Sequence, residues 1–225
     1  MNAPPDTHTL ACSHGDFSHW HRGRRRYGVW AIAADTPPVA AWVARLKADL
    51  GPWLLHGYSR QPHITVAVGG FPGPKRQEAD DYSAAGFSAQ HTALLEQAPP
   101  PFTLELGALA TFSSAPYLQV GGDTGSLGRL RQALVGAHPE PDPGPYTPHL
   151  TLGLYGGPYP LPAMRARLAA LSTGPGLTLE VRQLALMTYA AAVIGGPLET
   201  VARFDLESRC LEADSGVLER LFSRP

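Results

Sequence analysis

The 225-residue chain contains few lysines and little charge of either sign. Only Lys47 and Lys75 are lysines and the net charge is −1, which excludes the broad basic surface of a protein that coats duplex nucleic acid. Charged residues make up 16 % of the chain, whereas about 25 % is typical of soluble domains. A site that grips one phosphate group or one nucleic-acid end is still compatible with this composition.

Cysteine and long apolar runs are also scarce. Cys12 and Cys210 are the only cysteines, which argues against a disulfide framework and favours a reducing cytoplasm. No apolar run approaches the length of a membrane span. The run at 27–34 follows three arginines but is short, so we interpret it as a strand and not as part of a secretory signal. We therefore expect a cytoplasmic protein that has no membrane partner.

Several catalytic signatures are missing as well. The chain has no Gly-rich loop ending in Gly-Lys-Ser or Gly-Lys-Thr, no nucleophile elbow of the serine hydrolases and no carboxylate cluster for two metal ions. Residues 1–23 contain His8, Cys12, His14, His19 and His21, but their spacings match no standard zinc site. We interpret residues 1–23 as a flexible or loosely packed N-terminal arm, with a specific metal site as the less favoured alternative. We expect no metal and no cofactor.

Two stretches of the chain share the pattern Pro-His-apolar-Thr-apolar, at residues 62–66 and 148–152. Side chains of an extended strand alternate between its two faces. His63 and Thr65 therefore share one face, as do His149 and Thr151, while the residues between them are apolar and can be buried against helices. The polar faces of both strands must then line something polar, most simply a cleft.

Apolar periodicity predicts alternating strands and helices along the whole chain. Strands are expected at 27–34, 62–68, 102–109, 115–120, 147–154, 177–189 and 199–206. Helices are expected at 37–50, 77–97, 161–171 and 217–222, together with one whose apolar stripe runs over 127–135.

Landmarks of the first half recur in the second half at nearly the same offset. Asp-Thr precedes a helix at 35–36 and at 123–124, and each His-x-Thr strand ends at a Gly-Gly pair. We predict an α+β fold with two duplicated β-α-β-α-β lobes related by a pseudo-two-fold axis, in which two antiparallel sheets flank a central groove. The bilobal domain is expected over 24–207, with repeats at 27–114 and 115–206, and a tail at 208–225. Exchange of strands between the lobes is an open alternative.

This symmetry would bring both His-Thr pairs into one cleft. Two imidazoles suit a reaction that needs one base and one acid near neutral pH. Two hydroxyls beside them can bind the non-bridging oxygens of a phosphate and stabilise the charge that develops there. Because the metal, P-loop and serine-nucleophile signatures are missing, metal-free acid–base chemistry at a phosphodiester is the favoured interpretation.

At these residues the chain resembles the two-histidine (2H) phosphoesterase superfamily, in the branch named for the bacterial 2′-5′ RNA ligase and the plant cyclic phosphodiesterase. His63-Ile64-Thr65-Val66 and His149-Leu150-Thr151-Leu152 carry the resemblance, which spans roughly residues 26–207. It implies metal-independent hydrolysis or transesterification of 2′,3′-cyclic or 2′-5′ phosphodiester bonds on RNA ends or nucleotides. One histidine would activate water or a hydroxyl and the other would protonate the leaving oxygen, while Thr65 and Thr151 bind the phosphate. Which histidine is the base stays open.

Two other functions also stay open at this point. One is a non-catalytic nucleotide- or RNA-binding module that uses the same groove, and the other is an RNA ligase that runs the reverse reaction. Further candidate substrate contacts are Tyr155, Arg60, Tyr117 and Tyr146. Tyr155 is expected either to stack on a base or to have a structural role, and Arg60 either to reach a phosphate or to be a solvated surface residue. The expected partner is a nucleotide or an RNA end with a cyclic phosphate, not duplex DNA, and the expected state is a monomer.

Overall fold

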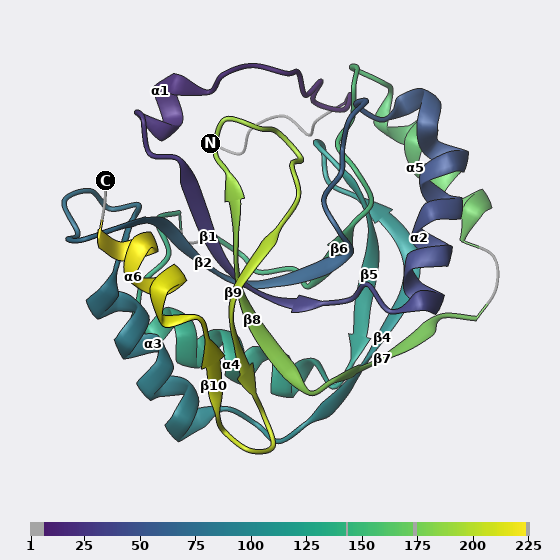
Figure 1. Ribbon diagram of the computed structural model, residues 1–225. Helices are drawn as coiled ribbons and strands as arrows, with labels where there is room; N and C mark the ends of the chain where they lie inside the picture. Colours follow the sequence, from purple (N-terminus) through teal and green to yellow (C-terminus); the bar gives the residue numbers. More distant parts are fainter. Residues whose placement is uncertain (1–6, 143, 173–174, 224–225) are drawn as a thin grey trace, which may run out of the picture.

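A computed structural model of the protein describes residues 7–142, 144–172 and 175–223. Figure 1 shows the helices and strands in these ranges. The strands are β1 (Arg26–Ala33), β2 (His63–Gly73), β3 (Asp81–Ser83), β4 (Phe102–Thr111), β5 (Pro116–Gly122), β6 (His149–Thr151), β7 (Leu177–Val181), β8 (Gln183–Ala190), β9 (Glu199–Asp205) and β10 (Leu211–Ala213). The helices are α1 (Ser18–His21), α2 (Pro37–Leu50), α3 (Ala84–Gln97), α4 (Thr124–Ala137), α5 (Leu161–Leu171) and α6 (Ser215–Ser223), with a 3₁₀ turn η1 (Gly51–Trp53).

The strands form one sheet in the order β10-β9-β8-β1-β2-β6-β5-β4-β7, antiparallel throughout, and β3 pairs in parallel with β2. The predicted α+β class with antiparallel pairing is confirmed, but the two expected sheets are joined into one. They join where β2 pairs with β6 and Ile64 lies opposite Leu150. We call this junction the seam. It separates a first half of the sheet (β10-β9-β8-β1-β2) from a second half (β6-β5-β4-β7).

Each half of the sheet contains strands from both sequence repeats. In the first half, β1 pairs with β2 of its own repeat and with β8 of the other repeat. In the second half, β4 from the first repeat pairs with β5 and β7 from the second. The single strand predicted at 177–189 is accordingly two strands, because the chain passes at Arg182 from β7 in the second half to β8 in the first.

The helices pack against the apolar face of the sheet. α3 and α4 pack against each other and against β2, whereas α5 packs against β4. In Figure 1, α3 and α4 lie at the lower left and α2 and α5 at the right. Ile64, Val66, Leu150 and Leu152 are fully buried in this core. Their burial drives the packing, and the strand period of two turns the neighbouring histidines and threonines to the opposite face.

Two elements start or end at other residues than the periodicity predicts. The helix expected from residue 77 starts at Ala84, because residues 81–83 pair with β2 and Ser83 caps the helix by accepting a hydrogen bond from Gly86 N (3.2 Å). The second His-x-Thr strand, expected at 147–154, is only His149–Thr151. It cannot begin earlier as a paired strand, because Pro148 has no N–H to donate to a ladder.

The N-terminal arm is bonded to the rest of the molecule over the residues that the structure describes, although we expected it to be flexible or loosely packed. Thr9 N donates to Tyr159 O and Cys12 N donates to Tyr155 O, both at 2.8 Å. Residues 1–6 of the arm lie outside the described residues. At the other end of the chain β10 pairs with β9, and Phe222 of α6 is buried. Among the described residues no helix is both long and apolar enough to cross a membrane.

Candidate active site

The two His-x-Thr motifs lie on neighbouring strands, one on each side of the seam. The antiparallel pairing of Ile64 with Leu150 puts His63 opposite Thr151, and Thr65 opposite His149. All four side chains line one cavity of about 390 Å³, which we call the seam cavity. The structure thus brings together the four residues that the repeat assigns to one site.

Both imidazole rings are held by the same backbone contact. Nδ1 of His63 lies 2.8 Å from Gln61 O, and Nδ1 of His149 lies 2.7 Å from Thr147 O. A carbonyl oxygen can only accept, so Nδ1 carries a hydrogen in both rings and donates it. Nε2 then has no hydrogen in the neutral ring, where it can accept a proton, and it can donate one when the ring is charged.

The two histidines differ in their exposure. His63 is only 8 % exposed, whereas His149 is half-buried. Burial, together with the nearby Arg60 and His149, lowers the pKa of His63 from 6.5 to about 4, against the opposing hydrogen bond to the Gln61 carbonyl. His63 is therefore neutral at pH 7 and is suited to accept a proton.

The walls of the seam cavity carry positive charge. Arg60 lines it beside the two histidines, and no Asp or Glu occurs among the described residues of the lining. The Arg60 guanidinium lies 4.0 Å from the ring centre of Tyr189, and its Nε donates to Gly196 O at 3.1 Å. These contacts hold the charge at the wall, so the cavity favours an anionic ligand.

Arg60 is one of four further substrate contacts predicted from the sequence, and the three tyrosines lie elsewhere. Tyr155 is fully buried and its hydroxyl lies 2.7 Å from Thr111 Oγ1, so its ring belongs to the core and offers no face for a base. Tyr117 is buried beside His149, with ring centres 5.5 Å apart. Tyr146 donates its hydroxyl to Thr65 O at 2.9 Å and so steadies the first motif. For Tyr155, this burial agrees with the structural alternative and is not compatible with base stacking.

Tyr146 lies in a smaller cavity that adjoins the seam cavity. This space of about 230 Å³ shares Thr65, Phe112 and His149 with the seam cavity. It also contains the ion pair between Arg131 and Glu140, in which the two charges offset one another, and the carboxylate of Asp142. The smaller cavity therefore adjoins His149 and adds one negative charge near it.

Sequence reasoning missed the aromatic residues of the seam cavity. Phe112 packs edge-on against His149, with ring centres 4.9 Å apart, and stacks on Tyr117 at 4.3 Å. The other missed rings in the lining are those of Phe17, Trp20, Tyr58 and Tyr189. Only Tyr189 carried a usable signal, since the strand period of two puts it on the same face as Ala185 and Met187. Phe112 follows a strand and Phe17 and Trp20 lie in an arm without periodicity.

A second cavity of about 420 Å³ meets the site only at His63 and its neighbours Gln61 and Pro62. Its charged lining is mixed, with Asp35, Glu180 and Asp205 beside Arg182 and Arg203. Neither threonine of the motifs lines it, so it lacks the paired imidazoles and hydroxyls of the seam cavity. Within the described ranges, no group of three or more His, Cys, Asp or Glu side chains could hold a metal ion.

Residues 35–192 match the family model of the 2′-5′ RNA ligase superfamily. The protein belongs to this superfamily. The match confirms the resemblance to two-histidine phosphoesterases that the two motifs carry, and it covers both motifs. Membership places the chain among phosphodiesterases and ligases that share this fold. Comparison with curated proteins gave no match.

Solved structures of the superfamily fold are similar over nearly their whole length. Apo LigT of E. coli is 16 % identical, with a TM-score of 0.53, and the match covers 82 % of this chain and 99 % of LigT. TT0787 of Thermus thermophilus is 18 % identical, with a TM-score of 0.55 and coverages of 80 % and 97 %. E. coli LigT complexed with 3′-AMP gives 16 % identity, a TM-score of 0.52 and coverages of 82 % and 99 %. At such identities the likeness shows the fold.

Proposed function

We propose that this superfamily member is a metal-independent phosphodiesterase that acts on 2′,3′-cyclic phosphate or 2′-5′ phosphodiester bonds of RNA ends or nucleotides. One observation carries the proposal: His63, Thr65, His149 and Thr151 line a single cavity whose charged side chains are cationic. The complex of E. coli LigT with 3′-AMP supports a nucleotide as ligand, because that protein shares the fold. We further propose that the protein acts as a monomer, since both motifs come from one chain.

The two imidazoles divide the work according to their surroundings. His63 is neutral because burial lowers its pKa to about 4, so its Nε2 accepts the proton of the attacking water. The water oxygen forms a bond to phosphorus as the bond to the ribose 2′ or 3′ oxygen breaks. His149, whose ring is only half-buried, donates a proton from Nε2 to that leaving oxygen. We propose this assignment for the base and the acid, which the sequence left open.

The two threonines would act on the phosphate itself. Each lies opposite the histidine of the other motif across the seam, so a phosphate between the imidazoles comes within reach of both hydroxyls. A hydroxyl donor to a non-bridging oxygen stabilises the negative charge that grows in the transition state. The Arg60 charge at the wall would draw the anion into the cavity.

The deciding experiment is turnover of a 2′,3′-cyclic nucleotide in the presence of EDTA. We expect the wild type to hydrolyse it, and His63→Ala and His149→Ala each to lose about 10³-fold in kcat. His56→Ala is the matched control, because His56 is an exposed histidine outside the cavity. Unchanged activity in both active-site variants would refute the assignment. Saturable nucleotide binding without turnover of cyclic or 2′-5′ substrates would identify a binding module instead, and joining of cyclic-phosphate and 5′-hydroxyl ends would identify a ligase.

A further inference from the structure

The N-terminal arm contributes side chains to the seam cavity, although it lies outside the part of the chain that matches the superfamily. The family match begins at residue 35, whereas Phe17 and Trp20 line the cavity together with the four motif residues. In Figure 1 the arm crosses the top of the molecule, from the side of α5 to α1 near β1. The arm therefore spans both halves of the sheet and passes over the site.

Hydrogen bonds fix the arm on the second half of the sheet. Thr9 Oγ1 donates to Gly157 O at 2.6 Å and accepts from Tyr159 N at 2.8 Å. Leu10 N donates to Ser113 O at 2.8 Å. Ser113 belongs to the turn that also carries Phe112 and Ser114 of the cavity lining. The arm is thus anchored next to the second motif before it reaches α1.

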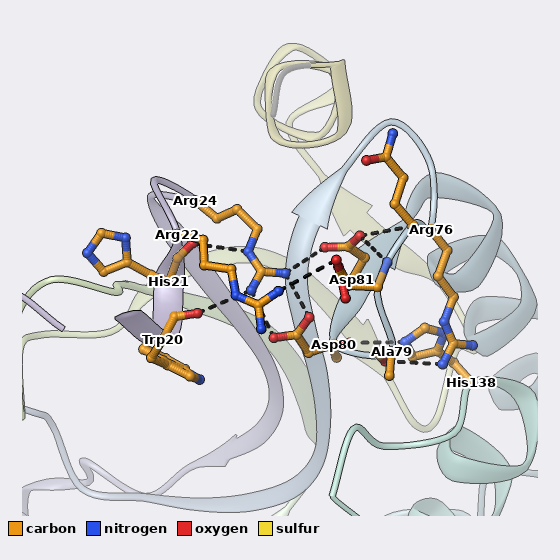
Figure 2. Close-up of polar contacts among 12 residues, drawn as sticks. Trp20, His21, Arg22, Arg24, Arg76, Ala79, Asp80, Asp81 and His138 are labelled. Carbon is orange, nitrogen blue, oxygen red and sulfur yellow. Dashed lines mark hydrogen bonds and ion pairs between the residues drawn. The ribbon is translucent and has the colours of Figure 1, made fainter. Parts of the chain in front are cut away.

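Arg24 fixes the other end of the arm on the first half, as Figure 2 shows. Its guanidinium bonds both carboxylate oxygens of Asp80 (2.7 and 2.9 Å) and Asp81 Oδ1 (2.8 Å). The same side chain donates to the carbonyls of Trp20 (3.3 Å) and His21 (3.1 Å). Asp80 and Asp81 lie beside β2, so this paired, charge-assisted contact ties α1 to the strand of the first motif.

The rings of the arm are part of a larger aromatic wall. Trp20 packs against Tyr27 (5.0 Å between ring centres) and Phe71 (4.8 Å). Tyr27 in turn contacts Tyr189, and the Arg60 guanidinium packs over the Tyr189 ring. Trp20 is only half-buried, so part of its ring is left to face the cavity.

The strained backbone conformation of Phe17 is evidence that this residue has a function at the cavity. Phe17 has φ 53° and ψ 25°, the left-handed conformation that a bulky residue rarely adopts. Trp20 N and His21 N both donate to Phe17 O, at 2.9 and 3.0 Å, which holds this conformation. Strain of this kind persists only where surrounding contacts over-determine it, and it is concentrated at ligand sites. Here it aims a phenyl ring at the cavity that holds the two imidazoles.

We propose that Phe17 and Trp20 form the base-binding wall of the active site and select substrates whose phosphate is joined to an aromatic nucleobase. The inference rests on the proposed function for the phosphate end of the ligand and extends it to the base. The volume of about 390 Å³ is in the range of small-ligand sites, roughly 300–1,000 Å³, and exceeds what a phosphate alone needs. Aromatic side chains hold unpaired bases by stacking, and they do so for every base. Arg24 acts as a positioning residue, because it bonds the backbone of the wall and not the ligand.

The test compares a 2′,3′-cyclic nucleotide with a methyl riboside 2′,3′-cyclic phosphate, which has the same reacting group and no base. Trp20→Ala and Phe17→Ala should each raise KM for the nucleotide about tenfold to a hundredfold and leave kcat nearly unchanged. Both should leave KM for the riboside as in the wild type. His19→Ala is the matched control on α1, because His19 is exposed and does not line the cavity. An equal change of KM on both substrates, or none on either, overturns the proposal.

Further variants separate a loss of the wall from a loss of folding. Trp20→Leu and Phe17→Leu keep apolar bulk in the fold but remove the extended ring, and they should retain most of the nucleotide-specific rise in KM. Arg24→Gln should show the same selective rise, with partial rescue by Arg24→Lys. If the wild type turns over neither substrate, the proposed function fails, but the base-binding wall can still be tested. The test is then calorimetric binding of a nucleoside monophosphate, compared with binding of ribose phosphate. Tighter binding of the nucleotide in the wild type, lost in Trp20→Ala, supports the base-binding wall. Equal affinity of the wild type for both ligands refutes it.

Discussion

The two His-x-Thr motifs share one backbone arrangement and differ in their surroundings. In both, the ring Nδ1 donates to the carbonyl two residues earlier, on the far side of a proline. Each histidine lines two cavities, but the first ring is only 8 % exposed and the second is half-buried. A duplicated motif thus supplies two identical functional groups, and the deeper burial of the first copy lowers the pKa of His63 to about 4.

The difference in burial has identifiable causes. Gln61, next to the first motif, exchanges two hydrogen bonds with the backbone of Leu198 (3.1 and 2.8 Å), which tie the segment before His63 to the chain between β8 and β9. The second motif has no such tie in the described residues around it. His149 instead packs edge-on against Phe112, which restrains a ring that is only half-buried.

The largest expected effect is the difference between the two histidine variants on a substrate whose leaving group needs no proton. With a nucleoside 3′-(4-nitrophenyl phosphate), nitrophenolate leaves without a proton, while the attacking 2′-hydroxyl still has to be deprotonated. This reaction runs in the reverse direction of ring opening, so His149, which protonates the ribose oxygen in hydrolysis, is the base for the ribose hydroxyl here. His149→Ala should lose about 10³-fold in kcat on this substrate, and His63→Ala should stay within about tenfold of the wild type. On a cyclic phosphate both variants should lose about 10³-fold. Single-turnover rates measure the contrast, and the reverse order of the two variants would exchange their roles.

The burial of His63 also predicts a pH dependence of folding. Its folded pKa of about 4 lies below the unfolded value near 6.5, so between these pH values the unfolded chain binds a proton that the folded chain does not. Stability is therefore full above pH 6.5 and is lost as the pH falls toward 4, by up to about 3 kcal/mol from this residue.

His63→Gln removes that contribution. Urea unfolding at pH 7 and at pH 4.5 should show a smaller loss of the free energy of unfolding in His63→Gln than in the wild type. His149→Gln leaves His63 in place, so it should keep the loss of the wild type. Equal losses in the wild type and His63→Gln would show that His63 is not protected from solvent in the free protein.

The threonines are expected to behave alike where the histidines do not. Thr65 and Thr151 are both half-buried and face equivalent positions across the seam. Thr65→Val and Thr151→Val keep the shape of the side chain and remove the donor, so each should lower kcat on a cyclic phosphate about 10²-fold. Steady-state kinetics with both variants checks this, and a difference of more than tenfold between them would show that the phosphate does not sit midway between the motifs.

The smallest expected effect is that of Phe112, whose ring contacts the histidine of the second motif and not that of the first. Phe112→Leu removes the edge contact with His149, and such aromatic pairs contribute about 0.5–1.5 kcal/mol. We expect a twofold to tenfold loss of kcat on the cyclic phosphate, and no further loss when Phe112→Leu is added to His149→Ala. An equal further loss in the double variant would show that Phe112 acts on the whole cavity and not through His149.

The sequence predicted the strands of the site well, because their apolar residues alternate strictly. Ile64 and Leu150 lie in the core, and the period of two then fixes the face of both histidines. The repeat of landmarks around the motifs was enough to predict that the two strands meet. The Nδ1 contacts were not predicted, since they depend on backbone geometry at Pro62 and Pro148 that no residue pattern records.

Other features depend on contacts between segments that are distant in the sequence. Tyr155 shares a face with Thr151 by alternation, but the strand ends at Thr151, so the alternation no longer applies and the ring turns into the core. The break at Arg182 divides a continuous apolar pattern, because its two ends are needed in different halves of the sheet. The arm has no periodicity, and its place follows from single bonds such as those of Thr9 and Arg24.

The seam has a mechanical consequence for the protein as a whole. One residue pair joins β2 to β6, so the alignment of the two imidazoles depends on the packing beneath Ile64 and Leu150 more than on a ladder of hydrogen bonds. An opening confined to this line would part the histidines while both halves keep their strands. Local openings of this kind need less free energy than global unfolding. Activity should therefore disappear at a lower denaturant concentration than the circular dichroism of the sheet, and backbone amides at the seam should exchange earlier than those of β1 and β8.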